Sequence, residues 1–104
     1  MEGDILTIKM KGIKYDKGKA QWDLLPYDVI EEVVDILTYG AKKYAPDNWK
    51  GVAPNRYESA MMRHFVAWKN GEELDNETNM HHLSHAICNL IFLRWLEKNK
   101  KINK

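Results

Sequence analysis

Proline and glycine divide this chain into segments that are long enough to form helices. Pro26 suits the first position of a helix, and Gly40 suits its end. Pro46, Gly51 and Pro54 then interrupt the chain and predict a loop. One helix is therefore expected before this loop, and the rest of the helical structure after it.

The segments between these breakers repeat their apolar residues at helical spacing. Helices are predicted over about residues 26–39, 55–70 and 78–98. Asn55 is a suitable N-cap for the second helix, and Gly71 ends it. The fold class is therefore all-α, a small helical bundle of three main helices.

Length and composition indicate one domain. The 104 residues predict a single helical domain over residues 1–104, with residues 1–15 and 99–104 peripheral and a brief strand at residues 5–8. A net charge of +1 argues against a nucleic-acid polymer as partner. Cys88 is the only cysteine, which excludes an internal disulfide and fits the cytoplasm. No apolar run is long enough to cross a membrane, so no membrane partner and no signal peptide are expected.

One face of the first predicted helix carries four carboxylates, at positions i, i+3, i+4 and i+7: Asp28, Glu31, Glu32 and Asp35. Such a face normally gains from lysines at i,i+4 spacing, and here none is interleaved. Mg²⁺ and Mn²⁺ take oxygen ligands, so the stripe suits a divalent cation. The alternative is an ordinary solvated outer face.

Three of the four histidines lie within five residues, just after two acidic residues. His82 and His85 are three positions apart, so both rings can reach one ion from the same face of a helix. Asp75 and Glu77 lie upstream and can add carboxylate oxygens. Neutral imidazole suits transition metals such as manganese, iron, nickel or zinc. The alternative is a helix start that carries its histidines incidentally.

Arg63 and His64 are adjacent in the second predicted helix. Arginine binds phosphate through two parallel hydrogen bonds, and histidine can act as acid, base or ligand near neutral pH. Neighbouring helical residues point about 100° apart, so both reach one site only if it lies between their faces. The alternative is an arginine paired with Asp75 or Glu77 and a histidine in the core.

The loop between the first two helices combines lysine, asparagine and tryptophan. Lys43 can hold a phosphate, Asn48 can hydrogen-bond the edge of a base, and Trp49 can stack on its face. The alternative is a packed loop in which the indole fills the core. Lys19, in the basic loop over residues 16–23, is a further candidate for substrate binding.

Six short motifs follow one another along the chain: DLLP, TYGAKKY, NW, RYESAMMRH, GEELDNET and HLSHA. In this order the chain resembles the N-terminal domain of phage dATP/dGTP diphosphohydrolases, over about residues 17–95. It is also similar to the MazG-like all-α nucleotide pyrophosphohydrolases. Those enzymes hold magnesium or manganese on acidic helices while water cleaves a nucleoside triphosphate between its α and β phosphates.

The resemblance implies hydrolysis of purine deoxynucleoside triphosphates, dATP or dGTP, to monophosphate and pyrophosphate in the cytoplasm of the host cell. The implied cofactor is a divalent metal, Mg²⁺ or Mn²⁺, with another transition metal as an alternative. The implied metal ligands come from two motifs, Glu31 and Asp35 in the first and Asp75, Glu77, His82 and His85 in the second.

Five further residues match recurrent positions of the family, and their chemistry suggests their roles. Lys43 and Arg63 would neutralise phosphate charge, and His64 would carry a proton. Trp49 would stack on the base, and Asn48 would hydrogen-bond it. Three helices enclose little volume, so a homodimer or homotetramer with sites completed between subunits is predicted.

Two other functions stay open at this point. The same fold and residues suit a phage protein that captures a nucleotide, including a cyclic or modified signal nucleotide of host defence, without cleaving it. A helical interaction module is the third reading, in which the many aromatic residues form an oligomer interface. The aligned carboxylates favour the enzyme, because a protein that only binds anions has little use for them.

Overall fold

The computed structural model describes residues 12–99, which form three α-helices, two short 3-10 helices and one isolated β-bridge. This confirms the predicted all-α fold. The strand predicted at residues 5–8 lies outside the described residues. None of the helices within the described range has the length and apolar character needed to cross a bilayer. In chain order the elements are η1 (Trp22–Leu24), α2 (Tyr27–Lys43), η2 (Asn48–Gly51), α3 (Pro54–Lys69) and α4 (His82–Lys98).

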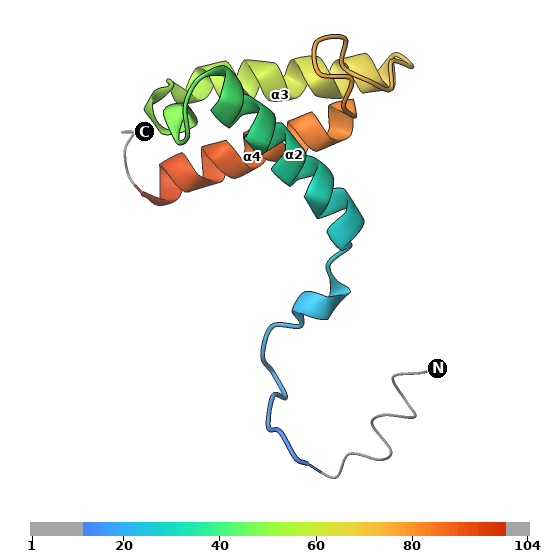
Figure 1. Ribbon diagram of the computed structural model, residues 1–104, viewed down its shortest axis with the longest axis vertical. Coiled ribbons are helices and arrows are strands. Elements are labelled where there is room, and N and C mark those ends of the chain that lie inside the picture. Colours follow the sequence, from blue (N-terminus) through green and yellow to red (C-terminus); the bar gives the residue numbers. More distant parts are fainter. Residues whose placement is uncertain (1–11, 100–104) are drawn as a thin grey trace.

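Helices α3 and α4 lie side by side, and α2 crosses α4 (Figure 1). The described residues before α2 lead away from the three helices. Large apolar side chains in this stretch are exposed, with Ile13 78%, Tyr15 85% and Trp22 71% accessible to solvent. A single chain thus leaves an apolar surface uncovered, which is typical of a protein–protein contact.

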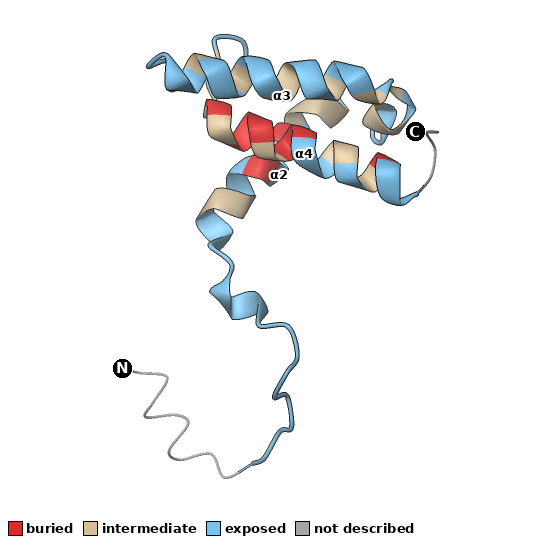
Figure 2. Cartoon of the chain, turned by 180° about the vertical axis from the view of Figure 1, so that it is seen from behind, coloured by how far each residue is buried: buried red, intermediate tan, exposed pale blue. Residues whose placement is uncertain are grey.

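The core lies where α2 crosses α4. Val33 and Ile36 of α2 pack with Cys88 of α4, and Phe92 is among the partly buried side chains around them. Figure 2 shows most of the buried residues on the two helices at this crossing, with further buried segments toward both ends of α4. Burial raises the pKa of the Cys88 thiol to about 12, so this cysteine stays protonated at neutral pH and behaves as a small apolar residue.

Helix α4 buries four polar side chains, those of His82, Ser84, His85 and Asn89. Burying a polar group costs free energy unless it is hydrogen-bonded. Ser84 donates to the Glu32 carboxylate on α2 at 2.6 Å, and Asn89 donates to the His85 carbonyl at 2.9 Å. The two histidines make their contacts with α3 and with the loop before α4, which places the candidate site at this end of the helix.

Helix α2 continues past Gly40, where the sequence predicted its end. The Tyr44 N–H bonds to the Gly40 carbonyl at 2.9 Å and extends the helical pattern. A glycine inside a helix costs only about 1 kcal/mol. The added turn satisfies further backbone groups and places Lys42 and Lys43 at the negative end of the helix dipole. Pro46 then stops the helix, because the residue before a proline avoids helical geometry.

Helix α4 begins at His82, four residues later than predicted, because the preceding segment forms a tight turn. The Asp75 N–H bonds to the Met80 carbonyl at 2.8 Å. Asn79 has φ 59°, the left-handed conformation that asparagine tolerates better than most residues. Thr78 therefore lies in this turn, not in the helix.

Candidate functional site

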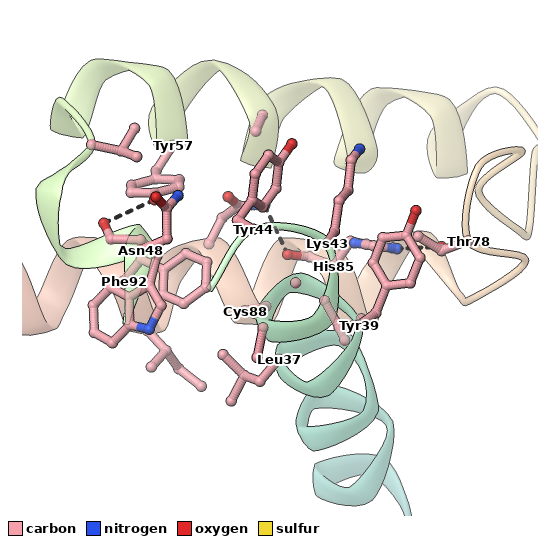
Figure 3. A pocket seen from close by; sticks show the side chains of 18 of the residues that line it. Leu37, Tyr39, Lys43, Tyr44, Asn48, Tyr57, Thr78, His85, Cys88 and Phe92 are labelled. Carbon is pink, nitrogen blue, oxygen red and sulfur yellow. Dashed lines mark hydrogen bonds between the residues drawn. The ribbon is translucent and has the colours of Figure 1, made fainter. Parts of the chain in front are cut away.

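A cavity of about 860 Å³ opens beside all three helices, a volume typical of small-molecule sites. Its walls come from the end of α2, the segment around η2, one face of α3, the middle of α4 and the turn that precedes α4. Figure 3 shows His85 and Thr78 at one end and Asn48, Tyr57 and Phe92 at the other. The cavity thus has a polar end and an aromatic end.

Three histidines from two helices meet at the polar end. The Nδ1 atoms of His64 on α3 and His82 on α4 lie 2.8 Å apart. The His64 ring also stacks on the His85 ring, with centroids 4.4 Å apart and planes at 7°. Burial lowers the pKa of His64 to about 4, and burial likewise lowers the pKa of His85. These two rings are therefore neutral at pH 7, the form in which imidazole binds metal ions.

Asp75 lies beside the histidines and is held by its own turn. Its Oδ2 atom accepts hydrogen bonds from the Thr78 N–H at 2.9 Å, the Thr78 hydroxyl at 3.1 Å and the Glu77 N–H at 3.1 Å. Burial alone would raise the pKa of Asp75, but the two Thr78 bonds bring it below its ordinary value. Ligand atoms of His64, Asp75 and His82 lie within 4.8 Å of one another, a spacing that suits one metal ion.

Thr78 joins this carboxylate to the third histidine. Its hydroxyl oxygen lies 2.7 Å from His85 Nε2 and also bonds to Asp75. The hydroxyl has one proton, and an ionised carboxylate is its stronger acceptor. We therefore assign the ring proton of His85 to Nε2, which donates to the Thr78 oxygen.

Replacing Thr78 with valine is expected to lower the free energy of unfolding by about 1–3 kcal/mol. Valine keeps the shape of the side chain but leaves the buried His85 N–H without an acceptor and removes one donor to Asp75. Urea unfolding followed by circular dichroism measures the change. Thr78→Ser is the matched control, since serine keeps the hydroxyl. An equal loss in both variants would contradict the assigned role of the hydroxyl.

Glu77 contacts the end of α2 instead of the histidines. Its Oε2 atom accepts from the Tyr39 hydroxyl at 2.7 Å and pairs with Lys43 Nζ at 2.5 Å. The bond to Lys43 lowers the pKa of Glu77, and the same bond raises the pKa of Lys43. The pair is exposed, so solvent screens it. The structure thus brings Lys43 to the cavity wall, with Glu77 as its partner there.

Two arginines of α3 line the cavity, Arg63 and, two turns earlier on the same face, Arg56. Within residues 12–99 neither forms an ion pair with a carboxylate, so the alternative in which Arg63 pairs with Asp75 or Glu77 is not what the structure has. Guanidinium groups without a carboxylate partner suit a phosphate ligand.

Trp49 and Asn48 lie at the aromatic end, and both line the cavity. The Trp49 ring stacks on Phe92 with centroids 4.6 Å apart and meets the edge of Trp95 at 5.1 Å. The Tyr57 hydroxyl donates to the Trp49 carbonyl at 2.9 Å. Trp49 therefore packs against the core and also borders the cavity. Its role as a stacking surface for a base stays a prediction.

Four candidate residues do not line the cavity. Glu31 and Asp35 are exposed on α2, Lys19 precedes η1, and His82 is buried behind the lining, where it contacts His64. Of the four-carboxylate stripe, Glu32 is the member that accepts the hydrogen bond from Ser84. Within one chain, Glu31 and Asp35 do not join the histidine cluster. As metal ligands they stay predictions that require a second chain.

Several residues that the sequence analysis did not single out also line the cavity, among them Tyr39, Tyr44, Arg56 and Thr78. Arg56 carried a signal, because it precedes Arg63 by seven residues and so shares its helix face. The two tyrosines flank Lys43 in the same short motif. Thr78 carried none, since a threonine before a helix is more often a cap.

Fold and cavity together define a class of protein: a small all-α domain with cationic side chains along a cavity wall and a histidine–carboxylate cluster at one end. The family model described as dATP/dGTP diphosphohydrolase, N-terminal, matches residues 9–104. The chain belongs to this family, which confirms the resemblance seen in the sequence motifs.

A curated relative is the dATP/dGTP diphosphohydrolase of Salmonella phage PMBT28. It is 38% identical over 91 residues, which cover 88% of this chain and 31% of the relative. The chain thus spans less than a third of the length of the curated relative that it matches. No solved structure matches the chain.

Proposed function

We propose that this chain hydrolyses purine deoxynucleoside triphosphates, dATP or dGTP, to the monophosphate and pyrophosphate with a divalent metal ion as cofactor, in the cytoplasm of a phage-infected cell. The observation that carries the proposal is the cavity itself, in which cationic side chains line the same space as His64, Asp75 and His85. The name of the phage relative, dATP/dGTP diphosphohydrolase, supports the same substrate class.

The residues that line the cavity suggest how the substrate would bind. Lys43 and Arg63 on its wall would hold the phosphates, and Arg56 adds a third cation. The base would lie toward Asn48 and Trp49, where an amide and an indole border the space. The cavity volume of about 860 Å³ is ample for a nucleotide.

The polar end has the chemistry of a divalent-cation site. Asp75 offers an ionised carboxylate and His82 a buried imidazole, both ligand types that Mn²⁺ accepts. When bound, the ion supplies polarisation of the phosphate oxygens and a more acidic water. Glu31 and Asp35 would add to it if another subunit brought them near.

Cationic side chains of the chain would neutralise the negative charge that develops on the leaving group during hydrolysis. Water would add to phosphorus and release a proton to the solvent, the P–O bond between the α and β phosphates would break, and negative charge would pass to the departing pyrophosphate. Arg63 and Lys43 line the cavity and would neutralise that charge, which is the main protein contribution in phosphoryl transfer.

A homodimer or homotetramer is part of the proposal. Exposed apolar residues before and within α2, such as Trp22, Leu24 and Val34, support it, with 71%, 74% and 49% of their surfaces accessible in one chain. Light scattering of the purified protein measures the mass in solution, and a mass of one chain at all concentrations would contradict it.

The test of function is a turnover assay with purified protein, dATP or dGTP, and Mn²⁺ or Mg²⁺, with a chelator as control. Equimolar monophosphate and pyrophosphate that disappear with the chelator are expected. Tight binding with full recovery of intact nucleotide would instead identify a nucleotide-binding protein. If the protein neither binds nor hydrolyses the nucleotide, the helical interaction module is the function that remains.

A further inference from the structure

We infer that His64, Asp75 and His82 form one metal site, and that this site takes a first-row transition ion such as Mn²⁺, Co²⁺ or Zn²⁺ in preference to Mg²⁺. His64 is then a metal ligand and not a proton carrier. The inference rests on the proposed function for the ion's role in hydrolysis, but binding of the ion can be measured without any nucleotide.

The first support is geometric. The Nδ1 atoms of His64 and His82 face each other at 2.8 Å, although the two residues come from different helices. Two nitrogens bound at right angles to one ion, each about 2.1 Å from it, lie about 3.0 Å apart. In the metal-free chain the 2.8 Å contact is a hydrogen bond between the two rings. An ion would take the place of its proton, and the two nitrogens would then have to separate only slightly. Ligand atoms of Asp75 complete the group within 4.8 Å.

The second support is the proton on His82. The His82 side chain is 6% exposed, and its Nε2 is the one buried side-chain nitrogen or oxygen in residues 12–99 that lacks a hydrogen bond. Glu72 Oε2 lies 3.4 Å away, close enough for a direct bond after a small shift. A proton on Nε2 suits this carboxylate, whereas a lone pair there would face negative charge. Nδ1 of His82 is then unprotonated and can bind a metal ion. A histidine ligand commonly donates its other ring N–H to a carboxylate in this way.

The third support is the state of Asp75. Its Oδ2 atom accepts three hydrogen bonds from its own turn, whereas Oδ1 accepts none from any residue in the described part of the chain. The carboxylate is thus held in place with one oxygen available to an ion. A ligand oriented before the ion arrives loses less conformational entropy on binding.

The other two predicted metal ligands near this cluster, His85 and Glu77, already form hydrogen bonds with other residues. Nε2 of His85 bonds to Thr78, and Glu77 bonds to Lys43 and Tyr39. Two imidazoles and one carboxylate favour a transition ion, because Mg²⁺ prefers oxygen ligands. Three protein ligands also leave positions open for water and a phosphate oxygen.

The test is a titration of the whole chain, freed of metal by a chelator, with Co²⁺ in the absence of nucleotide. Calorimetry and the visible absorption of Co²⁺ are expected to show one ion per chain. His64→Gln, His82→Gln and Asp75→Asn are each expected to weaken binding by on the order of 100-fold. His81→Asn is the matched control and should bind like the wild type, because it removes a neighbouring histidine while asparagine preserves the cap that His81 provides to Leu83.

The inference is overturned if the wild type binds no Co²⁺, or if His64→Gln binds it as tightly as the wild type does. Circular dichroism shows whether each variant is folded. If a variant fails to fold, nuclear magnetic resonance of the imidazole nitrogens in the wild type decides. Zn²⁺ should then shift the His64 and His82 nitrogens, and a shift confined to His81 would refute the site. If the wild type binds the ion but does not hydrolyse nucleotide, the proposed function is rejected and the metal site stands. If turnover depends on metal but His64→Gln binds Co²⁺ as tightly as the wild type does, the metal site is rejected and the proposed function stands.

Discussion

Replacing Arg63 with alanine is expected to lower kcat/KM for dATP or dGTP by about 10³-fold. Arg63 lines the cavity and has no carboxylate partner within residues 12–99, so its charge is available to the phosphates. Its effect should fall mainly on kcat, because charge on the leaving pyrophosphate is greatest in the transition state. Steady-state assays of pyrophosphate release measure the loss.

Two further variants separate this role from a general effect of charge. Lys69→Ala removes a cation from the same helix at a position that does not line the cavity, and it should leave kcat unchanged. Arg63→Lys should recover part of the activity, since lysine retains the charge but not the two parallel hydrogen bonds. Full activity in Arg63→Ala would remove Arg63 from the site.

Replacing Leu96 with alanine is expected to lower the free energy of unfolding by about 2–5 kcal/mol. Leu96 is 1% exposed and is the largest fully buried side chain in the described part of the chain. Removing three buried carbons loses their transfer free energy and leaves a cavity that a short helix can only partly close. Because domains of this size are stable by only about 5–15 kcal/mol, the variant should unfold at markedly lower urea concentration.

The control for Leu96→Ala is Leu90→Ala on the same helix. Leu90 is 50% exposed, so its truncation should change stability by no more than about 0.5 kcal/mol at protein concentrations where the chain is monomeric. Urea unfolding of both variants by circular dichroism compares them directly. Equal losses in the two variants would show that burial within one chain does not decide the stability of α4.

The helices were predictable because their signals are local. Pro26 and the apolar spacing after it indicated α2, and Pro54 lies at the start of α3, one residue before the predicted position. The ends were less predictable where a local preference met a competing contact. Gly40 favours an end, but further backbone bonds carry α2 three residues beyond it. Asp75 and Asn79 replace the first turn of the predicted third helix with a tighter turn.

The sequence predicted the chemistry of the site, but only some of the residues that form it. Helical spacing and residue chemistry pointed to Asp75, His82 and His64, which the structure brings together. They gave no indication that Thr78 would bridge Asp75 and His85, since that contact depends on where the turn places one hydroxyl. Spacing also grouped Glu77 with the histidines. In the fold its carboxylate instead bonds to Lys43 of α2, which lies 34 residues earlier in the sequence.

The sequence by itself determined the number and approximate limits of the helices, the family of the chain and the residue types available for metal and phosphate. These follow from short-range spacing, backbone preference and side-chain chemistry. The tertiary structure alone decided which side chains share the cavity. The angle at which α2 crosses α4 turns Glu32 toward Ser84 and leaves Glu31 and Asp35 in solvent. Such contacts depend on packing between distant segments, which periodicity along one helix does not encode.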